Sequence, residues 1–435
     1  MMMRAFRPRM VGPRPWQLAN RLWWFRPSLL ILAIVIPVYL SFLTYEYERW
    51  VPNRYVPSDL YWWGLVLLLV LALGAAIGGT LGRAPRGGIP GLARAVDVPA
   101  GLLATLLALT LLAYAIWFGP IVLQPQRVVE LLTGQRDNLR DTLDTLPGIT
   151  TLTQCGVAYV VLYAVKRYAG TRPVAAWETA GLALVMLLAV VRAILWSERL
   201  AVIEVVLAYV VALGAYFSFR THGTRLFAGM LPFIAPLGLY LAFTATEYFR
   251  SWYFCKDEYS SIWLFSYERL ATYYAVATNS GIGLLQETRN WPVFTGGYVF
   301  QWAYQFPVIG ELLTDAIGNT RSFYQQFLEM HGRPEFNNPT GIFVIVFDIG
   351  YVGALFYFFV AGLAIGAVHR AWSQQRVGGV LLYPSCFLFV LELLRFNYFA
   401  SPRFIPVIVS LLIALWVIRS RPRLNVSPVL RQREA

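Results

Sequence analysis

Long apolar runs separated by short polar segments dominate this chain. A run of about 18 or more apolar residues can cross roughly 30 Å of hydrocarbon as a helix. Ten runs are candidate transmembrane spans, near residues 27–46, 59–81, 98–121, 149–165, 174–196, 200–218, 226–248, 340–366, 378–396 and 402–419. The pattern therefore predicts an all-α polytopic membrane protein with about ten transmembrane helices.

The orientation of these spans follows from the distribution of basic residues, which collect in cytoplasmic loops. If the N-terminus is cytoplasmic, every inside segment is basic, whereas the outside loops are short or mixed in charge. No small-residue cleavage site follows the first run, so it is interpreted as a retained span, not a signal peptide. Both termini are expected in the cytoplasm, and the opposite face is called the outer side below.

Two outer segments are long. Residues 1–248 hold seven spans with a short outer segment at 122–148, residues 249–339 form a long outer segment, and residues 340–435 hold three spans and a tail. Helical spacing predicts helices over 128–143, 261–277 and 312–330, with an ordered loop over 289–307. A connection of this length with its own helical pattern is typical of functional loops.

The amino-acid composition limits the classes of protein to which this chain can belong. Hydrophobic residues make up 58% of the 435 residues and charged residues 14%, against about a quarter charged in soluble domains. The net charge of +13 is dispersed between apolar runs, so no nucleic-acid partner is expected. Three scattered cysteines form no disulfide framework. No nucleotide-binding fingerprint is present, and a lone histidine among carboxylates is a poor metal site, so no cofactor or metal is expected.

Charged residues gather at the outer ends of spans five to ten. A charge at membrane depth is costly and usually faces a cavity or a partner. The set comprises Arg192, Glu198, Arg199, Glu204, Glu247, Arg250, Asp348, Glu392, Arg395 and Arg403. Snorkelling to the interface is the alternative, with most weight for Arg199 and Arg403. For the whole set we favour a polar cavity that opens outward, and its arginines predict an anionic ligand such as a lipid-linked phosphate.

The long outer segment adds further candidates. Additional anion ligands are Arg269, Arg289 and Arg321. His331 is a candidate general base, because a neutral imidazole near an arginine-bound phosphate can accept a proton. Glu329 or Glu335 can serve equally. The alternative for His331 is an ordinary solvated loop residue.

One stretch resembles a known family. The order Asn338-Pro339-Thr340, followed by Asp348-Ile349-Gly350-Tyr351-Val352-Gly353, resembles the end of the long periplasmic loop and the next span in Wzy-type oligosaccharide repeat-unit polymerases. The run from Tyr267 to Tyr274 resembles the start of that loop, and Arg321 with Gly332 fits an R-x10-G pattern of some members. The resemblance covers about residues 265–365.

This resemblance implies a GT-C-like membrane fold in a bacterial inner membrane, with a site facing the periplasm. The donor would be a glycan on undecaprenyl pyrophosphate and the acceptor a hydroxyl of a lipid-linked repeat unit. The transfer would be metal-independent and inverting, with arginines on the leaving pyrophosphate and a base on the acceptor. Asn338 and Asp348 would belong to the site, and a chain-length regulator protein would be a partner.

The same motif has structural explanations. Asn338 can cap the eighth span with Pro339 at its first position. Gly350 and Gly353 can allow close helix packing, and Asp348 can be a structural hydrogen-bonding residue. Two other functions stay open: an O-antigen ligase, and a transporter or flippase of lipid-linked oligosaccharide. A transporter often contains repeated halves, and no repeat is evident in the sequence.

Overall fold

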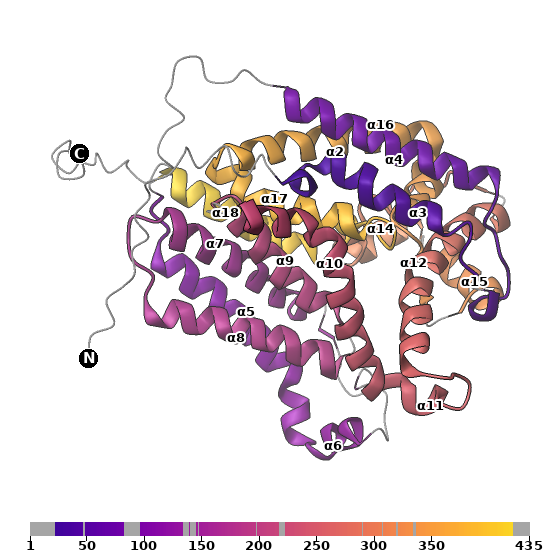
Figure 1. The fold of residues 1–435 in the computed structure, drawn as a ribbon, viewed down its shortest axis with the longest axis horizontal. Helices are drawn as coiled ribbons and strands as arrows, with labels where there is room; N and C mark the ends of the chain where they lie inside the picture. Colours follow the sequence, from indigo (N-terminus) through magenta and orange to yellow (C-terminus); the bar gives the residue numbers. More distant parts are fainter. Residues whose placement is uncertain are drawn as a thin grey trace.

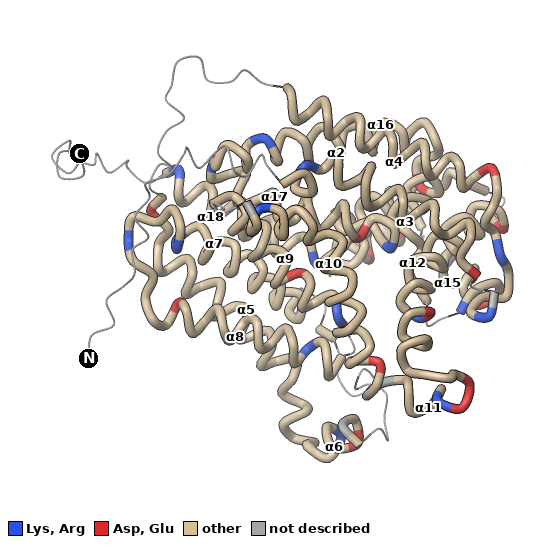
Figure 2. The backbone as a smooth tube through the Cα atoms, viewed as in Figure 1, with Lys and Arg blue, Asp and Glu red and all other residues tan. Residues whose placement is uncertain are grey.

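The computed structural model describes residues 22–46, 48–81, 96–133, 139, 145–146, 148–196, 198–216, 222–288, 290–306, 308–318, 321–333 and 336–420. Within these ranges the regular structure is helical, apart from one isolated bridge between Val96 and Gly170. Figure 1 shows the helices, and Figure 2 shows long uncharged stretches along α4 and α5. An all-α fold is thereby confirmed.

Each of the ten predicted spans coincides with helix. The helices are α2 (Pro27–Leu30), η2 (Ile31–Val35) and α3 (Ile36–Ser41), then α4 (Asp59–Thr80), α5 (Ala100–Leu123), η5 (Thr150–Gln154) with α7 (Cys155–Ala169), α8 (Ala176–Leu195), α9 (Leu200–Gly214), α10 (His222–Glu247), α16 (Phe343–Ser373), α17 (Val377–Glu392) and α18 (Phe404–Ser420). Five of them, α4, α5, α8, α10 and α16, are long and apolar enough to cross a membrane. The structure is therefore that of a membrane-embedded protein.

Helices α4 and α16 pack in parallel through small residues. A Cβ atom added to Gly78 would lie 2.1 Å from the Leu363 carbonyl oxygen, and one added to Gly366 would lie 2.2 Å from the Ala75 carbonyl oxygen. Gly74 and Gly362 are similarly close to the partner backbone, so each helix contributes a G-x-x-x-G motif to the contact. Such motifs bring membrane helices together by van der Waals packing. Parallel membrane helices must be separated by an odd number of crossings, and the predicted topology places five spans, the third to the seventh, between these two.

The entry to α16 differs from the expectation. The helix begins at Phe343, so the predicted cap by Asn338 is wrong: residues 337–340 are not helical and the N-cap is Ile342, which has no side-chain cap bond. Gly350 has φ 71° and ψ 174° and breaks α16 after two turns. Because L-residues rarely adopt that backbone conformation, Gly350 is required for the break, not for helix packing.

The long outer segment is folded and helical. It contains η6 (Tyr248–Trp252), α11 (Tyr253–Cys255), α12 (Ile262–Glu287), α13 (Gln301–Tyr304), α14 (Ile309–Ile317) and α15 (Arg321–His331). The helix predicted over 261–277 continues to residue 287, and the one predicted over 312–330 is two helices. The helix predicted over 128–143 is described only as α6 (Gln126–Leu132). In Figure 1, α12, α14 and α15 gather at the right-hand end of the bundle.

One buried carboxylate lies at the opposite, inner end of the bundle and is paired. Glu178, in the first turn of α8, is fully buried and lies against the ammonium group of Lys166 in the last turn of α7. Its other oxygen accepts a hydrogen bond of 2.9 Å from the Ala175 amide. A buried ion pair of this kind is structural, because each charge satisfies the other.

Candidate functional site at the outer end of the bundle

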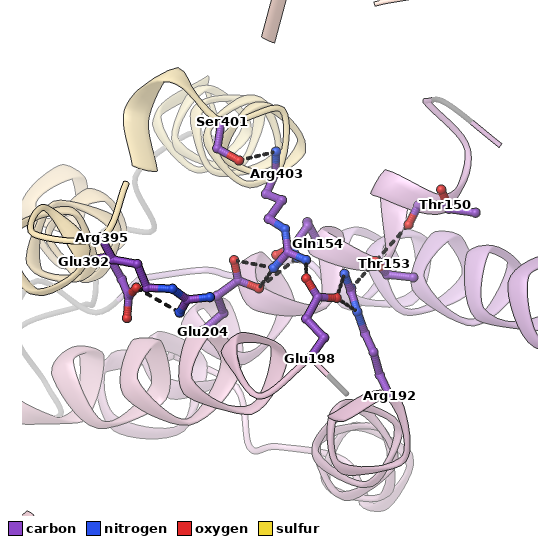
Figure 3. A network of polar contacts seen from close by, with 10 residues as sticks. All are labelled: Thr150, Thr153, Gln154, Arg192, Glu198, Glu204, Glu392, Arg395, Ser401 and Arg403. Atoms are coloured by element: carbon purple, nitrogen blue, oxygen red, sulfur yellow. Dashed lines mark hydrogen bonds and ion pairs between the residues drawn. The ribbon is translucent and has the colours of Figure 1, made fainter. Parts of the chain in front are cut away.

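Six of the ten charged residues predicted at the outer ends of the spans lie close together (Figure 3): Arg192, Glu198, Glu204, Glu392, Arg395 and Arg403. Arg192, in the last turn of α8, donates from Nε to Glu198 Oε2 at 2.7 Å and from Nη1 to Thr153 Oγ1 at 2.9 Å. The other oxygen of Glu198 pairs with Arg403, which precedes α18. One carboxylate therefore joins two arginines from different helices.

Glu204 extends the network into the bundle. It lies on α9 and is 1% exposed. Arg403 Nη1 is 3.4 Å from both of its carboxylate oxygens, and Gln154 Nε2 donates to Oε2 at 2.9 Å. The ends of η5, α8, α9 and α18 are thus tied together by charge-assisted hydrogen bonds, which are stronger than neutral ones.

Glu392 and Arg395 stand beside this network at the end of α17. Arg395 Nη1 lies 3.4 Å from Glu392 Oε2, while the buried Arg395 Nε has no hydrogen-bond partner among the described residues. Glu392 is 3% exposed and close enough to Glu204 for the two charges to interact. Tyr274 of α12 is near both Glu392 and Arg395. The outer segment therefore borders the network.

The number of carboxylates beside these arginines changes the interpretation made from the sequence, which was a cavity whose arginines bind an anion. The predicted arginines Arg192, Arg395 and Arg403 do converge, but Glu198, Glu204 and Glu392 match them one for one. The network is formally neutral and largely buried, so it is not an arginine cluster left open to an anion. Arg395 is the exception, because its pairing is long and its side chain is 26% exposed.

A second cluster gathers at the outer end of α10. Glu247 is fully buried and pairs with Arg199 of the α8–α9 turn and, at 3.0 Å, with Nε of Arg269 on α12. The Arg199 guanidinium also donates to Thr246 Oγ1 at 3.0 Å and lies 3.7 Å from the centre of the Phe243 ring. Two arginines from different segments thus lie around one glutamate. This cluster lies next to the neutral network, because Arg199 follows Glu198 directly.

Asp348 holds the outer loop onto α16. Its carboxylate is fully buried and accepts hydrogen bonds from the amides of Gly296 (2.8 Å), Tyr298 (2.9 Å) and Val299 (3.0 Å). The Thr295 hydroxyl lies 3.3 Å from Oδ1. With its oxygens occupied by the loop, Asp348 anchors the loop, as the structural alternative expects, and its contact with substrate stays a prediction.

The Asp348→Asn variant is expected to release this loop. An amide group keeps one acceptor oxygen and turns its NH₂ toward backbone donors, so about 3 kcal/mol of local stability is lost. Hydrogen exchange of the Gly296, Tyr298 and Val299 amides should accelerate accordingly. The matched control, Thr295→Val, removes the hydroxyl that contacts Asp348 and the Gly297 amide, and it should leave the amides of Gly296, Tyr298 and Val299 protected. Unchanged exchange in Asp348→Asn would show that the loop is held by other contacts.

His331 lies elsewhere in the outer segment. Its Nε2 is 4.0 Å from Glu287 Oε2, and its ring stacks on Phe327. Glu287 accepts a 3.0 Å hydrogen bond from the Tyr55 hydroxyl, and burial raises the pKa of Tyr55 to about 12, so that hydroxyl stays a donor. Glu329 is exposed and accepts from Gln325 Nε2 at 3.2 Å. Neither candidate base makes a described contact with Arg192, Arg395 or Arg403.

Several predicted site residues are not placed. Arg289 and Glu335 lie outside the described residues, and the side chains of Arg250 and Arg321 do as well. Asn338 is half-buried in the non-helical stretch before α16.

Sequence reasoning did not identify Thr153, Gln154, Glu287 or Tyr55 as partners of charged residues. Thr153 and Gln154 are polar residues at the outer start of the fourth predicted span, whereas Tyr55 lies in the first outer loop and Glu287 in the long outer segment. No family model matches this chain, and no curated protein or solved structure is significantly similar to it.

Proposed function

We propose that the chain is an inner-membrane glycosyltransferase that polymerises lipid-linked oligosaccharide repeat units at the outer face. The observation that carries the proposal is the position of Arg395, partly exposed and at a long distance from its partner Glu392, beside Arg192 and Arg403 at one end of an apolar bundle that the folded outer segment borders. The motif resemblance around Asn338 and Asp348 supplies the glycan chemistry. An undecaprenyl pyrophosphate carries its charge at the depth where these arginines lie.

In the proposed reaction, the acceptor hydroxyl attacks the anomeric carbon of the donor glycan. The bond from that carbon to the pyrophosphate oxygen breaks, the pyrophosphate leaves with the bonding pair, and the hydroxyl proton passes to a base. Arg395 is suited to the leaving group, because its buried Nε is unpartnered among the described residues and its pairing with Glu392 is long. A guanidinium makes bidentate contacts with phosphate.

The balanced charges suggest where the base comes from. When pyrophosphate engages Arg395, Glu392 loses its partner and becomes an unpaired carboxylate in a buried position. A carboxylate released in this way can accept the proton of the acceptor hydroxyl as a general base. Glu392 is therefore preferred as the base over His331 and Glu329, which lie against other partners.

The Arg395→Ala variant is expected to lower polymer synthesis by about two to three orders of magnitude, as for loss of a preorganised charge-stabilising donor. Arg395→Lys should recover little, because an ammonium group lacks the bidentate geometry. Surface glycan on gels and protein level in membranes are the measurements. The control Arg49→Ala removes an exposed arginine paired with Glu258 and should leave polymer unchanged.

Deletion of the gene tests the proposal as a whole. Persistence of full-length polymer would overturn it. Accumulation of single lipid-linked repeat units supports a polymerase, whereas accumulation of long unattached polymer would identify a ligase.

A further inference from the structure

Helix α14, in the long outer segment, is amphipathic, and its apolar face is exposed. Its apolar residues have the i, i+3, i+4, i+7, i+8 spacing of one helix face. They are Ile309, Leu312, Leu313, Ala316 and Ile317, whereas Glu311 and Asp315 lie on the other face. A helix on the surface of a soluble domain turns its apolar face to the core. In α14, however, Ile309, Leu312 and Ile317 are exposed, so the rest of the chain leaves most of this face uncovered.

The chain that leads into α14 exposes further large apolar side chains. They are Phe294, Phe300, Phe306 and Val308. Large exposed apolar surfaces mark contacts with a membrane or with another protein. Residues 294–317, called the exposed apolar segment below, therefore require a partner that the chain itself does not supply.

Backbone hydrogen bonds fix the start of this segment against the membrane-crossing helix α16. The amide of Val293 donates to the Phe347 carbonyl at 3.1 Å, and the amide of Phe294 donates to the Asp348 carbonyl at 2.7 Å. Helix α16 begins at Phe343, and five residues of helix rise about 7 Å. The interfacial region of a bilayer is about 5–7 Å thick on each side. Phe294 therefore lies close to the depth at which the hydrocarbon begins.

Two aromatic contacts give the same depth from the side of α4. The ring of Trp291 lies 5.6 Å from that of Tyr351, and the Tyr351 ring lies 5.1 Å from that of Trp63. Trp63 and its neighbour Trp62 are exposed near the outer end of α4, which is long and apolar enough to cross a membrane. Tryptophans in such positions mark the boundary between membrane and water. The exposed apolar segment thus starts beside this boundary.

Tyr304 of α13 connects α14 to this anchored start. Its hydroxyl donates to the Thr295 carbonyl at 2.5 Å, and its side chain is close enough to Asp348 for the two to interact. A Cβ atom added to Gly310 would clash with the Tyr304 carbonyl oxygen, so the start of α14 packs directly on α13. Helix α14 is therefore held near the level of the Asp348 anchor.

We infer that α14 is an interfacial helix that lies in the plane of the membrane, with its apolar face among the acyl chains of the outer leaflet. Its other face borders a cavity of about 690 Å³, which is lined in part by Glu311, Thr314 and Asp315 and opens to water. One apolar and one charged face is the pattern of helices that lie on membranes. This role goes beyond the proposed function, because it holds whatever reaction the chain performs.

Charge and continuity favour lipid as the occupant of the apolar face. No lysine or arginine lies between residues 290 and 320, so insertion depends on apolar area and not on anionic head groups. A second copy of the chain is the competing occupant. The segment, however, starts beside the exposed Trp62 and Trp63, where the protein surface already faces the bilayer.

Photo-cross-linking to lipid tests the inference. Benzoylphenylalanine is placed at Leu312 (65% exposed) and, as the matched control on the other face of α14, at Glu311. Leu187 of the membrane-crossing helix α8 (58% exposed) gives the reference for full contact with lipid. The full-length protein is reconstituted in phosphatidylethanolamine and phosphatidylglycerol vesicles with tritiated acyl chains. Labelling at position 312 is expected to approach that at 187 and to exceed that at 311 by about tenfold, which corresponds to about 1.4 kcal/mol.

A charge on either face extends the test to the orientation of the helix. With benzoylphenylalanine at Ile309, Leu312→Glu should lower the labelling by about tenfold, because it places a carboxylate on the same face. Thr314→Glu, on the polar face, should leave the labelling unchanged.

Each other outcome decides against an interfacial helix. Weak labelling at both 311 and 312 would mean that α14 lies in water. Equally strong labelling at both positions would mean that the helix is wholly immersed in lipid. A cross-linked dimer from position 312 would make the apolar face an interface between copies of the chain.

Discussion

The Gly78→Leu variant is expected to be the most destabilising single change in the apolar bundle. Its Cβ would lie 2.1 Å from the carbonyl oxygen of Leu363, which is backbone and cannot rotate away. Helices α4 and α16 would have to separate along their whole shared face. Overpacking typically costs about 1–3 kcal/mol, and a backbone clash belongs at or above the upper limit of that range. Unfolding in SDS titrations of the purified protein measures the loss.

The neighbouring glycine supplies a matched control. A Cβ added to Gly79 would meet nothing within 4 Å, so Gly79→Leu should leave the unfolding midpoint almost unchanged. Equal destabilisation by the two variants would show that leucine disturbs α4 for a reason other than contact with α16. A graded loss from Gly78→Ala to Gly78→Leu is expected, because the first variant already introduces the clashing atom.

Both G-x-x-x-G motifs can be recognised in the sequence, but the contact between the two helices that carry them cannot be predicted from it. Gly74 with Gly78 and Gly362 with Gly366 have the spacing of close-packing membrane helices. Nothing local says that the second span packs against the eighth, because that contact depends on the arrangement of all helices between them. The positions of the spans were predictable for a simpler reason: apolar length is a property of each run alone.

The location of the candidate site could be predicted from the sequence, but the ion pairs within it could not. Positive-inside reasoning placed Arg192, Arg395 and Arg403 at one end of the bundle, and the structure brings them together there. Which glutamate each arginine contacts depends on how α8, α9 and α18 are rotated about their axes. The hydrophobic runs specify this rotation poorly. Asp348 was ambiguous for a related reason, because its partners are amides of a loop some fifty residues earlier in the chain.

The Arg403→Met variant is expected to lower the free energy of unfolding by about 3–5 kcal/mol, because it leaves buried carboxylates without their charged partner. Glu204 is 1% exposed and would retain only the neutral donors Gln154 and Tyr398 among its described partners, while Glu198 would keep Arg192. An exposed pair offers the contrast: Arg49→Met should cost no more than about 1 kcal/mol, as for surface ion pairs.

Adding Glu204→Gln to Arg403→Met separates structure from function. The double variant removes one charge of each sign, so the network is again neutral, and Gln154 can still donate to the amide oxygen at position 204. Stability in detergent should return to within about 1 kcal/mol of the parent. If Arg403 also takes part in the proposed reaction, polymer should nevertheless stay absent, because the double variant does not restore its guanidinium group. Recovery of polymer together with stability would mean that Arg403 only holds the helices together, and that anion binding belongs to Arg395 and its neighbours on α12.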